Sequence, residues 1–407
     1  MIILQIHSFY EVRGGEDGVV ESEKQLLEKN GHTVLTFYKY NSSLLNKNKF
    51  LVAINSIWKI KILHELNSFL KKNKPDVVHC HNTFPLISPA IYWACARESI
   101  PVVQTLHNYR LLCPSAILFF KGEIYESSIG KLFPWQAVKD RVYRDSRSGT
   151  LVVASMLFFH RIIGTWKNKV TLYIALTQFQ KEKMIEGGIK SSKIVLKGNF
   201  LNDEFLSNIK NNQLREIKKQ YGSYCIFVGR ISFEKGYKEL VMAWNEFLIR
   251  NTDTNKKLII IGDGPNFRDL VNLIEEFDMK DSIILLGKRD KIEVLSFISC
   301  SEFLILPSIW YEGFPLTIIE AFASGKPVLA SKIGAIPDII VNKENGLIFE
   351  KGDIFDMSNS IRWAFENHDK INEMGKSARK SYIEKYSNDI ALKNLVSTYN
   401  KVLKVDA

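Results

Sequence analysis

Short apolar runs that alternate with amphipathic segments constrain the fold of this chain more than any other feature of its sequence. Each run is rich in β-branched residues and is followed by a segment with helical spacing, which is typical of parallel sheets flanked by helices. The sequence therefore predicts an α/β chain with two doubly wound sheets. The runs expected as strands are residues 2–8, 32–38, 77–82, 102–108, 172–177, 193–199, 224–230, 257–264, 283–288, 303–308, 326–331 and 346–350.

The chain has 407 residues, which is too long for one ordinary hydrophobic core and favours two domains. We place the boundary near residues 197–203, where a predicted strand ends and a polar, Asn- and Lys-rich helix begins. The expected parts are an N-terminal domain over 1–200, a C-terminal domain over 201–385 and a C-terminal helix over 386–407. The pattern does not decide whether that helix stays on the second domain or crosses back to the first.

The net charge of +11 lies in the first half of the chain. Residues 1–200 hold 27 Lys and Arg against 15 Asp and Glu, whereas the second half is close to neutral. A one-sided basic field suggests an anionic partner, such as a membrane surface, a lipid phosphate or a nucleic acid. The alternative is that the lysines only decorate solvated helices.

The cysteines and the apolar segments bear on the compartment. The five cysteines are scattered and never form a CxxC pair, which argues against a disulfide framework or a zinc site. The longest apolar window, residues 151–159, is well short of the roughly 20 residues that span a bilayer. The N-terminus has the features of a first strand and not those of a signal peptide. We therefore expect a protein of the reducing cytoplasm.

Two acids, Glu312 and Glu320, flank the start of a predicted helix in the segment YEGFPLTIIEAFASG. Pro315 suits the first helical turn and Gly325 suits the position after its end, which puts Glu312 in the loop and Glu320 on the helix. The backbone N–H groups of Gly313, Phe314 and Leu316 would then be free to bind phosphate. Since carboxylates repel phosphate, we expect the acids to accept hydrogen bonds from hydroxyl groups, unless both are merely solvated.

The segment GRISFEKG, residues 229–236, places two cations on a loop after a predicted strand. Arg230 can bind a diphosphate through its bidentate fork and Lys235 as a point charge, so together they can stabilise negative charge on a leaving group. Basic residues in such loops are usually only solvated, so this segment alone is a weak signal.

Two further loops of the first half carry candidate residues. Gly14 and Gly15 follow the first strand and allow a close backbone approach to a ligand, although such a pair is more often just a turn. His107, after a later strand, could meet a sugar hydroxyl or could be a structural histidine. His79 and His81 alternate on a strand, but no third metal ligand with suitable spacing appears, so we interpret them as structural.

The motifs RGG, LHN, GRISFEKG, IGDGP and EGFPLTIIE together resemble the retaining glycosyltransferases of family 4. The resemblance extends over essentially the whole chain, and the two glutamates around GFPL are its most specific element. It implies the GT-B fold, in which two Rossmann-like doubly wound domains face an interdomain cleft. Residues 106–114 and 141–166 are similar to the branch found in bacterial surface-polysaccharide clusters.

The resemblance implies an enzyme that transfers a hexose, with retention, from a nucleotide-diphosphate sugar to a growing, lipid-linked surface glycan such as O-antigen, capsule or exopolysaccharide. Glu312, His107, Arg230 and Lys235 would be catalytic. Neither a metal nor a cofactor is expected, because the two cations neutralise the diphosphate. The enzyme would work at the inner face of the cell membrane, bound peripherally to its anionic surface. The residues implied in donor binding are Arg230, Lys235, Gly313, Phe314, Pro315, Leu316, Glu320 and Gly15.

Two other functions stay open at this point. The first is a nucleotide-sugar 2-epimerase on the same fold, which would turn over its substrate without an acceptor. The second is a basic, non-enzymatic module that binds nucleic acid. Against the second, the sequence has neither an aromatic-basic pattern on its strands nor a recognition helix, so nucleic acid is not an expected partner.

Overall fold

The computed structural model describes residues 1–10, 14–40, 55–251 and 255–404. It divides into two compact units, and the chain passes from the first to the second between Asn199 and Phe200. The first unit comprises the described residues of 1–120, 125–199 and 391–407, and the second comprises 121–124 and 200–390. None of the helices in the described ranges has the length and apolar character that a bilayer crossing requires.

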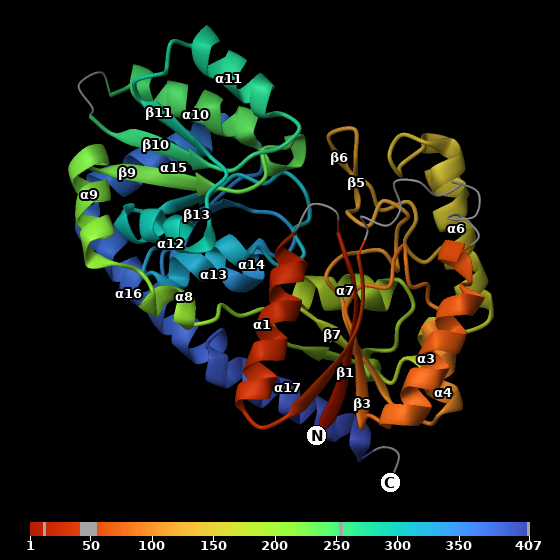
Figure 1. The fold of residues 1–407 in the computed structure, drawn as a ribbon. Helices are drawn as coiled ribbons and strands as arrows, with labels where there is room; N and C mark the ends of the chain where they lie inside the picture. Colours follow the sequence, from red (N-terminus) through yellow and green to blue (C-terminus); the bar gives the residue numbers. More distant parts are fainter. Residues whose placement is uncertain (11–13, 41–54, 252–254, 405–407) are drawn as a thin grey trace. The chain divides into compact units, whose positions relative to one another are not determined.

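The first unit is built on a six-stranded parallel sheet in the order β2-β1-β3-β4-β7-β8 (Figure 1). Since β1 lies between β2 and β3, the strand order reverses at β1, and ligands of open α/β sheets bind at such switch points. The strands are β1 (Ile2–Phe9), β2 (Thr33–Tyr40), β3 (Val77–Cys80), β4 (Val102–Thr105), β7 (Leu172–Ala175) and β8 (Ile194–Leu196).

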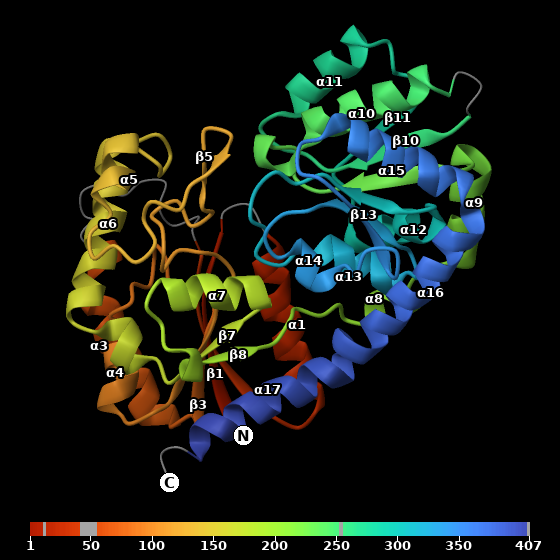
Figure 2. The same cartoon turned by 180° about the vertical axis from the view of Figure 1, so that it is seen from behind.

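The C-terminal helix belongs to this unit from Ala391 onward. Figure 2 shows this helix, α17 (Asn388–Leu403), against the sheet, where its Leu395 and Tyr399 join the core that contains Ile3 and Val77. The remaining helices are α1 (Gly15–Lys29), α3 (Ile60–Asn73), α4 (Ile91–Arg97), α5 (Trp135–Asp140), α6 (Arg147–Ile162) and α7 (Gln178–Glu186), with short helical turns at Thr165–Lys169 and Ser191–Lys193.

The second unit contains a parallel sheet in the order β11-β10-β9-β12-β13-β14. Its strand order reverses between β9 and β12, so the loops after these two strands diverge from one point. The strands are β9 (Tyr224–Val228), β10 (Lys257–Ile261), β11 (Ile283–Gly287), β12 (Leu304–Leu306), β13 (Val328–Ser331) and β14 (Gly346–Phe349).

A core with a large aromatic group holds this unit together. Trp244, Phe247, Phe303 and Phe365 lie in one buried cluster between the sheet and the helices α10 and α15. The helices are α8 (Glu204–Ser207), α9 (Asn211–Tyr221), α10 (Tyr237–Ile249), α11 (Phe267–Glu276), α12 (Lys291–Cys300), α13 (Leu316–Ala323), α14 (Ile336–Ile339), α15 (Ile354–Glu366) and α16 (His368–Lys385), with a helical turn at Phe233–Lys235.

The predicted fold class is confirmed, because both units are Rossmann-like and each predicted apolar run overlaps an observed strand. The sequence did not predict the small two-stranded sheet of β5 (Phe119–Phe120) and β6 (Glu123–Ile124). Strands of two residues are too short to show a period, so no pattern could have indicated them. The five cysteines are buried free thiols.

Candidate functional site

The candidate site of the second unit lies at the point where its strand order reverses. The loop after β9 carries Arg230 and Lys235, and the loop after β12 carries Glu312. A backbone hydrogen bond of 3.0 Å from the Ile309 amide to the Glu234 carbonyl joins the two loops. The topology therefore brings together residues that are about 80 positions apart in the sequence.

Glu312 is buried, with 5% of its surface exposed, and its carboxylate is held from two sides. The Lys235 Nζ donates to Oε1 over 2.7 Å, and the Ser308 hydroxyl donates to the same oxygen over 2.6 Å. Lys235 also lies 5.4 Å from the centre of the Trp310 ring. A buried carboxylate with this much support is rigid, so it can present a fixed acceptor to a ligand.

Gly236 allows the close approach of the two loops. Its φ is +72°, and a Cβ at this position would lie 1.9 Å from the Pro307 carbonyl oxygen. Only glycine combines this backbone conformation with that contact at no steric cost. The Lys235–Glu312 pair therefore depends on the glycine that follows Lys235.

Arg230 does not point to the same partner as Lys235. Its guanidinium is 61% exposed and pairs with Glu234 over 2.5 Å, and its Nε donates to Ser232 over 3.2 Å. The structure thus holds the two cations of this loop on two different carboxylates. A diphosphate would have to draw both cations away from these partners.

Glu320 lies on α13 as predicted, and Glu312 lies in the loop before it. Glu320 is 4% exposed and forms an ion pair with Lys291, the first residue of α12. Lys291 is a residue that the sequence did not single out, because its segment has the charge pattern of an ordinary solvated helix start. Each of the two predicted acids thus has a lysine partner.

The start of α13 differs slightly from the prediction. The helix begins at Leu316, and Pro315 precedes it as the capping residue with ψ at 105°, so proline is not in the first turn. Gly325 follows the helix with φ at +67°, which agrees with its predicted place. The amides of Gly313, Phe314 and Leu316 remain at the N-terminal end of this helix.

In the first unit, Gly14 and Gly15 form the start of α1, after β1. Asp17 accepts from the Gly14 amide over 2.9 Å and from His7 Nε2 over 2.8 Å, which fixes this turn. Beside it, Asn82 Nδ2 donates to Glu16 over 3.1 Å, and burial raises the pKa of Glu16. Arg13 of the RGG motif lies outside the described residues.

His107 follows β4 and lines a pocket together with His81, Asn82, Asn108 and Arg110. Its Nε2 is 3.0 Å from His81 Nδ1, and the two rings stack. Burial, together with His7 and Lys197, lowers the pKa of His107 well below the usual range. The imidazole is therefore neutral at physiological pH and offers one donor and one acceptor.

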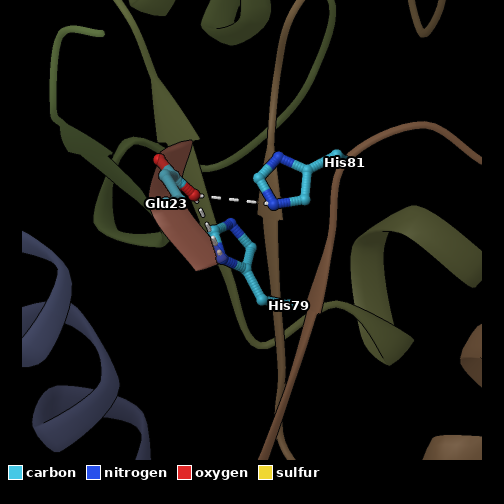
Figure 3. Close-up of side chains that lie close together, drawn as sticks. All are labelled: Glu23, His79 and His81. Atoms are coloured by element: carbon cyan, nitrogen blue, oxygen red, sulfur yellow. Dashed lines mark ion pairs between the residues drawn. The ribbon is translucent and has the colours of Figure 1, made fainter. Parts of the chain in front are cut away.

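The fold places a third potential metal ligand beside His79 and His81, which sequence spacing did not predict. Glu23 of α1 lies in the buried interior, 3.7 Å from His79 Nδ1 and 3.5 Å from His81 Nε2 (Figure 3). The Lys197 ammonium, also buried, pairs with the other oxygen of Glu23. Because a lysine already neutralises this carboxylate, the cluster is a poor site for a divalent cation.

Two family models match adjacent parts of the chain. "Glycosyltransferase Family 4" matches residues 14–205, and "Glycosyl transferases group 1" matches residues 209–381. The first match covers the strands of the first sheet other than β1, and the second covers most of the second unit.

Curated relatives are about a quarter identical to the chain over the parts that align. The N-acetyl-alpha-D-glucosaminyl L-malate synthase of Bacillus anthracis is 26% identical over 47% of this chain and 50% of its own length, so the chain spans about half of that relative. CapM of Staphylococcus aureus, a capsular polysaccharide biosynthesis glycosyltransferase, is 29% identical over 57% of this chain and 62% of its own length. A 41.2 kDa protein of the cps region of Klebsiella pneumoniae is 24% identical over 98% of this chain and 99% of its own length.

Solved structures share the fold over almost all of the chain. A glycosyltransferase from Rickettsia africae ESF-5 superposes with a TM-score of 0.72 at 20% identity and covers 99% of this chain and 98% of its own. Anabaena Alr3699/HepE in complex with UDP superposes with a TM-score of 0.70 at 16% identity and covers 98% of this chain and 100% of its own. The likeness shows that the two Rossmann-like units form a GT-B fold.

Proposed function

The chain belongs to the family 4-type glycosyltransferases of the GT-B fold, and on this premise we propose that it transfers a hexose, with retention, from a nucleotide-diphosphate sugar to a surface glycan. The observation that carries this proposal is the buried Glu312 with Lys235 at the switch point of the second sheet. The UDP complex of the Anabaena neighbour supports a nucleotide donor.

The donor would bind to the second unit through its two ends. Arg230 and Lys235 would move from their present carboxylates to the diphosphate. The amides of Gly313, Phe314 and Leu316 would bind its outer phosphate. Glu312, which stays hydrogen-bonded to Ser308, would then accept a hydrogen bond from a hydroxyl of the transferred sugar. Glu320 would accept from the ribose diol, with Lys291 beside it.

The chemical step would need no nucleophile from the protein. The bond from the sugar C1 to the diphosphate oxygen breaks, and a bond from C1 to the acceptor oxygen forms on the same face. The acceptor proton passes to the departing phosphate. Arg230 and Lys235 would stabilise the charge that develops on this phosphate, so the reaction would not depend on a metal ion. His107 and the Gly15 turn would lie on the sugar and acceptor side.

We propose a lipid-linked glycan as the acceptor and the inner face of the cell membrane as the place of action. The relatives from a capsule and a cps region support a role in polysaccharide biosynthesis. In the first unit, exposed apolar side chains occur near α5 and α6: Trp135 is 68% exposed, and Leu132, Phe159 and Ile162 are exposed as well. They lie in the sequence among lysines and arginines, a mixture suited to lipid headgroups.

Part of the basic and aromatic segment at residues 131–197 is not available to a membrane. Trp166 and Lys197 are buried, and Phe133 and Phe158 are half-buried. The docking surface that we propose is therefore the smaller set of exposed residues, Lys131, Leu132, Trp135, Lys139, Arg147, Phe159 and Ile162.

A thermal-shift panel of UDP, GDP, ADP and their sugars tests the donor class. A ligand at 100 times its dissociation constant stabilises the folded state by about 2.7 kcal/mol, so one nucleotide should raise the melting temperature clearly. Failure of every nucleotide to do so would contradict the proposal. Conversion of the nucleotide sugar with no acceptor present would favour the epimerase alternative.

A further inference from the structure

A chain of polar side chains in the interior of the first unit leads to His107. Lys197 pairs with Glu23 Oε1, Glu23 Oε2 lies 3.5 Å from His81 Nε2, and His81 Nδ1 lies 3.0 Å from His107 Nε2. Glu23 is 0% exposed and His81 4%. Glu23 comes from α1, and the other three residues come from the segments that follow β3, β4 and β8, so the packing of α1 on the sheet brings them together.

Two atoms that face each other in this row of buried side chains have no hydrogen-bond partner. Glu23 Oε2 and His81 Nε2 are both buried and unpaired. A gap of 3.5 Å is too short for a bridging water, and a shift of a few tenths of an ångström would bring the two atoms to the usual distance of about 3.0 Å. A buried carboxylate oxygen can only accept, so the pair is satisfied only when His81 carries its proton on Nε2.

The proton on His81 Nε2 determines the state of His107. Burial, together with the neighbouring histidines and Lys197, lowers the pKa of His81 well below its usual range, so this imidazole carries a single proton. Its Nδ1 is then an acceptor, and the 3.0 Å contact requires a proton on His107 Nε2. The opposite arrangement would place two lone pairs against each other at Glu23.

We propose that Glu23 and His81 are positioning residues that hold His107 as the Nε2–H tautomer, so that its Nδ1 lone pair is left as a hydrogen-bond acceptor in the pocket of the first unit. Among the described residues, no protein atom pairs with this Nδ1. A ligand hydroxyl would donate to it. The inference rests on the proposed function only in identifying that hydroxyl as one of a sugar.

The neighbouring His79 provides a matched control. It is also buried and lies two residues before His81, on β3, but its two nitrogens contact the Tyr399 hydroxyl and the Thr105 hydroxyl, each over 2.8 Å. It makes no hydrogen bond to His107, and its Nδ1 lies 3.7 Å from Glu23 Oε2, beyond hydrogen-bond distance. Substitution of His79 should therefore disturb the same interior without changing the tautomer of His107.

Nitrogen-15 NMR of histidine-labelled, full-length protein without substrate tests the proposal. His107 is assigned by the signals lost in His107→Gln, and wild-type protein should show its proton on Nε2. In Glu23→Gln, Lys197 should keep the amide oxygen and turn the NH₂ group toward His81, which reverses both histidines and puts the His107 proton on Nδ1. Adding Lys197→Met frees the amide oxygen for His81 and should restore Nε2–H.

The outcomes are separable from those of the transfer reaction, because no substrate is present. A wild-type His107 with its proton on Nδ1 would overturn the inference, even if the variants fail to fold. So would an unchanged tautomer in a folded Glu23→Gln protein, or a change of the same kind in His79→Gln. If the transferase assignment also holds, Glu23→Gln should lower kcat about 10- to 100-fold, with the donor KM nearly unchanged.

Discussion

Glu320 and Glu312 are equally buried, yet their removal should affect different steps. If Glu320 holds the ribose, Glu320→Ala should weaken binding of the nucleoside diphosphate by about 1.5–3 kcal/mol, roughly 10- to 100-fold, as expected for hydrogen bonds to a charged group. Glu312→Ala should leave this affinity nearly unchanged and lower kcat, because its proposed partner is the sugar. Isothermal titration with the diphosphate and steady-state kinetics separate the two effects.

The lysine partners supply the control for this experiment. Lys291→Ala removes the ion pair of Glu320 and leaves the carboxylate in place. If loss of the ion pair alone weakened binding, this variant would behave like Glu320→Ala. Equal affinity in the folded Glu320→Ala protein and the wild type would contradict the ribose assignment.

Arg230 should contribute to the chemical step without help from a metal. Its exposed guanidinium pairs only with residues of its own loop in the described structure, so it is available to a leaving diphosphate. Arg230→Ala should raise the barrier by about 2–4 kcal/mol, the usual effect of losing one preorganised donor to a developing charge. Transfer by the wild type should survive EDTA. The exposed Arg362 on α15 is the matched control for the arginine substitution. Full inhibition of the wild type by EDTA, reversed by magnesium or manganese, would exclude the metal-free mechanism.

His79 should make the first unit less stable in acid. Burial, with a smaller effect of Lys197, lowers its pKa from 6.5 to about 4. Between these values the unfolded chain binds a proton that the folded chain does not, so the free energy of unfolding falls as the pH drops from about 6.5 to about 4. The shift corresponds to a loss on the order of 3 kcal/mol. Urea unfolding at both ends of this range should show a smaller loss in His79→Gln than in a variant of the exposed His64.

At the scale of elements, the loops after β9 and β12 are joined by a contact that only glycine permits. Gly236→Ala should force these loops apart, since its Cβ would meet the Pro307 oxygen at 1.9 Å. Both the melting temperature and the donor affinity should fall. Gly222→Ala is the matched control: Gly222 has a φ of +65° with open space around it, so it tests the cost of the conformation without the clash. Equal losses in the two variants would show that the contact is unimportant.

Much of the fold and of the candidate site could be predicted from the sequence, because it depends on hydrophobic periodicity and on which residues follow the strands. The apolar runs predicted the strands, and Pro315 and Gly325 predicted that Glu312 lies in a loop and Glu320 on a helix. These signals are local, so they need no knowledge of packing.

The remaining parts of the site depend on contacts between distant segments. Lys291 looks like a solvated helix residue until the loop after β11 brings it to Glu320. Glu23 lies in the charged, polar segment ESEK, and only the packing of α1 on the sheet buries it against His79 and His81. A search for buried positions of an amphipathic helix would have included Glu23, but no sequence signal indicated its partners.

At the scale of the whole molecule, the unequal charge of the two halves remains the strongest argument for an anionic partner. The structure weakens this argument in one place, because Lys197 is buried and neutralised by Glu23. The structure strengthens the argument for an anionic partner in another place. The exposed side chains of Leu132 and Trp135 lie close in sequence to the exposed Lys131 and Lys139. Apolar side chains and cations in one segment favour a lipid surface over a nucleic acid.

Liposome flotation should therefore recover the protein with anionic vesicles and not with neutral ones, and salt should weaken the binding. Each basic residue near such a surface contributes about 1 kcal/mol, so the double reversal Lys131→Glu and Lys139→Glu should reduce binding by about 2 kcal/mol or more. The same change at two exposed lysines of α16, Lys376→Glu and Lys385→Glu, alters the net charge equally and should have little effect.

Leu132→Ser with Trp135→Ser should weaken binding at high salt, where the apolar contribution dominates. Equal loss from both charge reversals would mean that net charge alone drives the association, and no binding to either vesicle would remove the membrane proposal while leaving the transferase assignment intact.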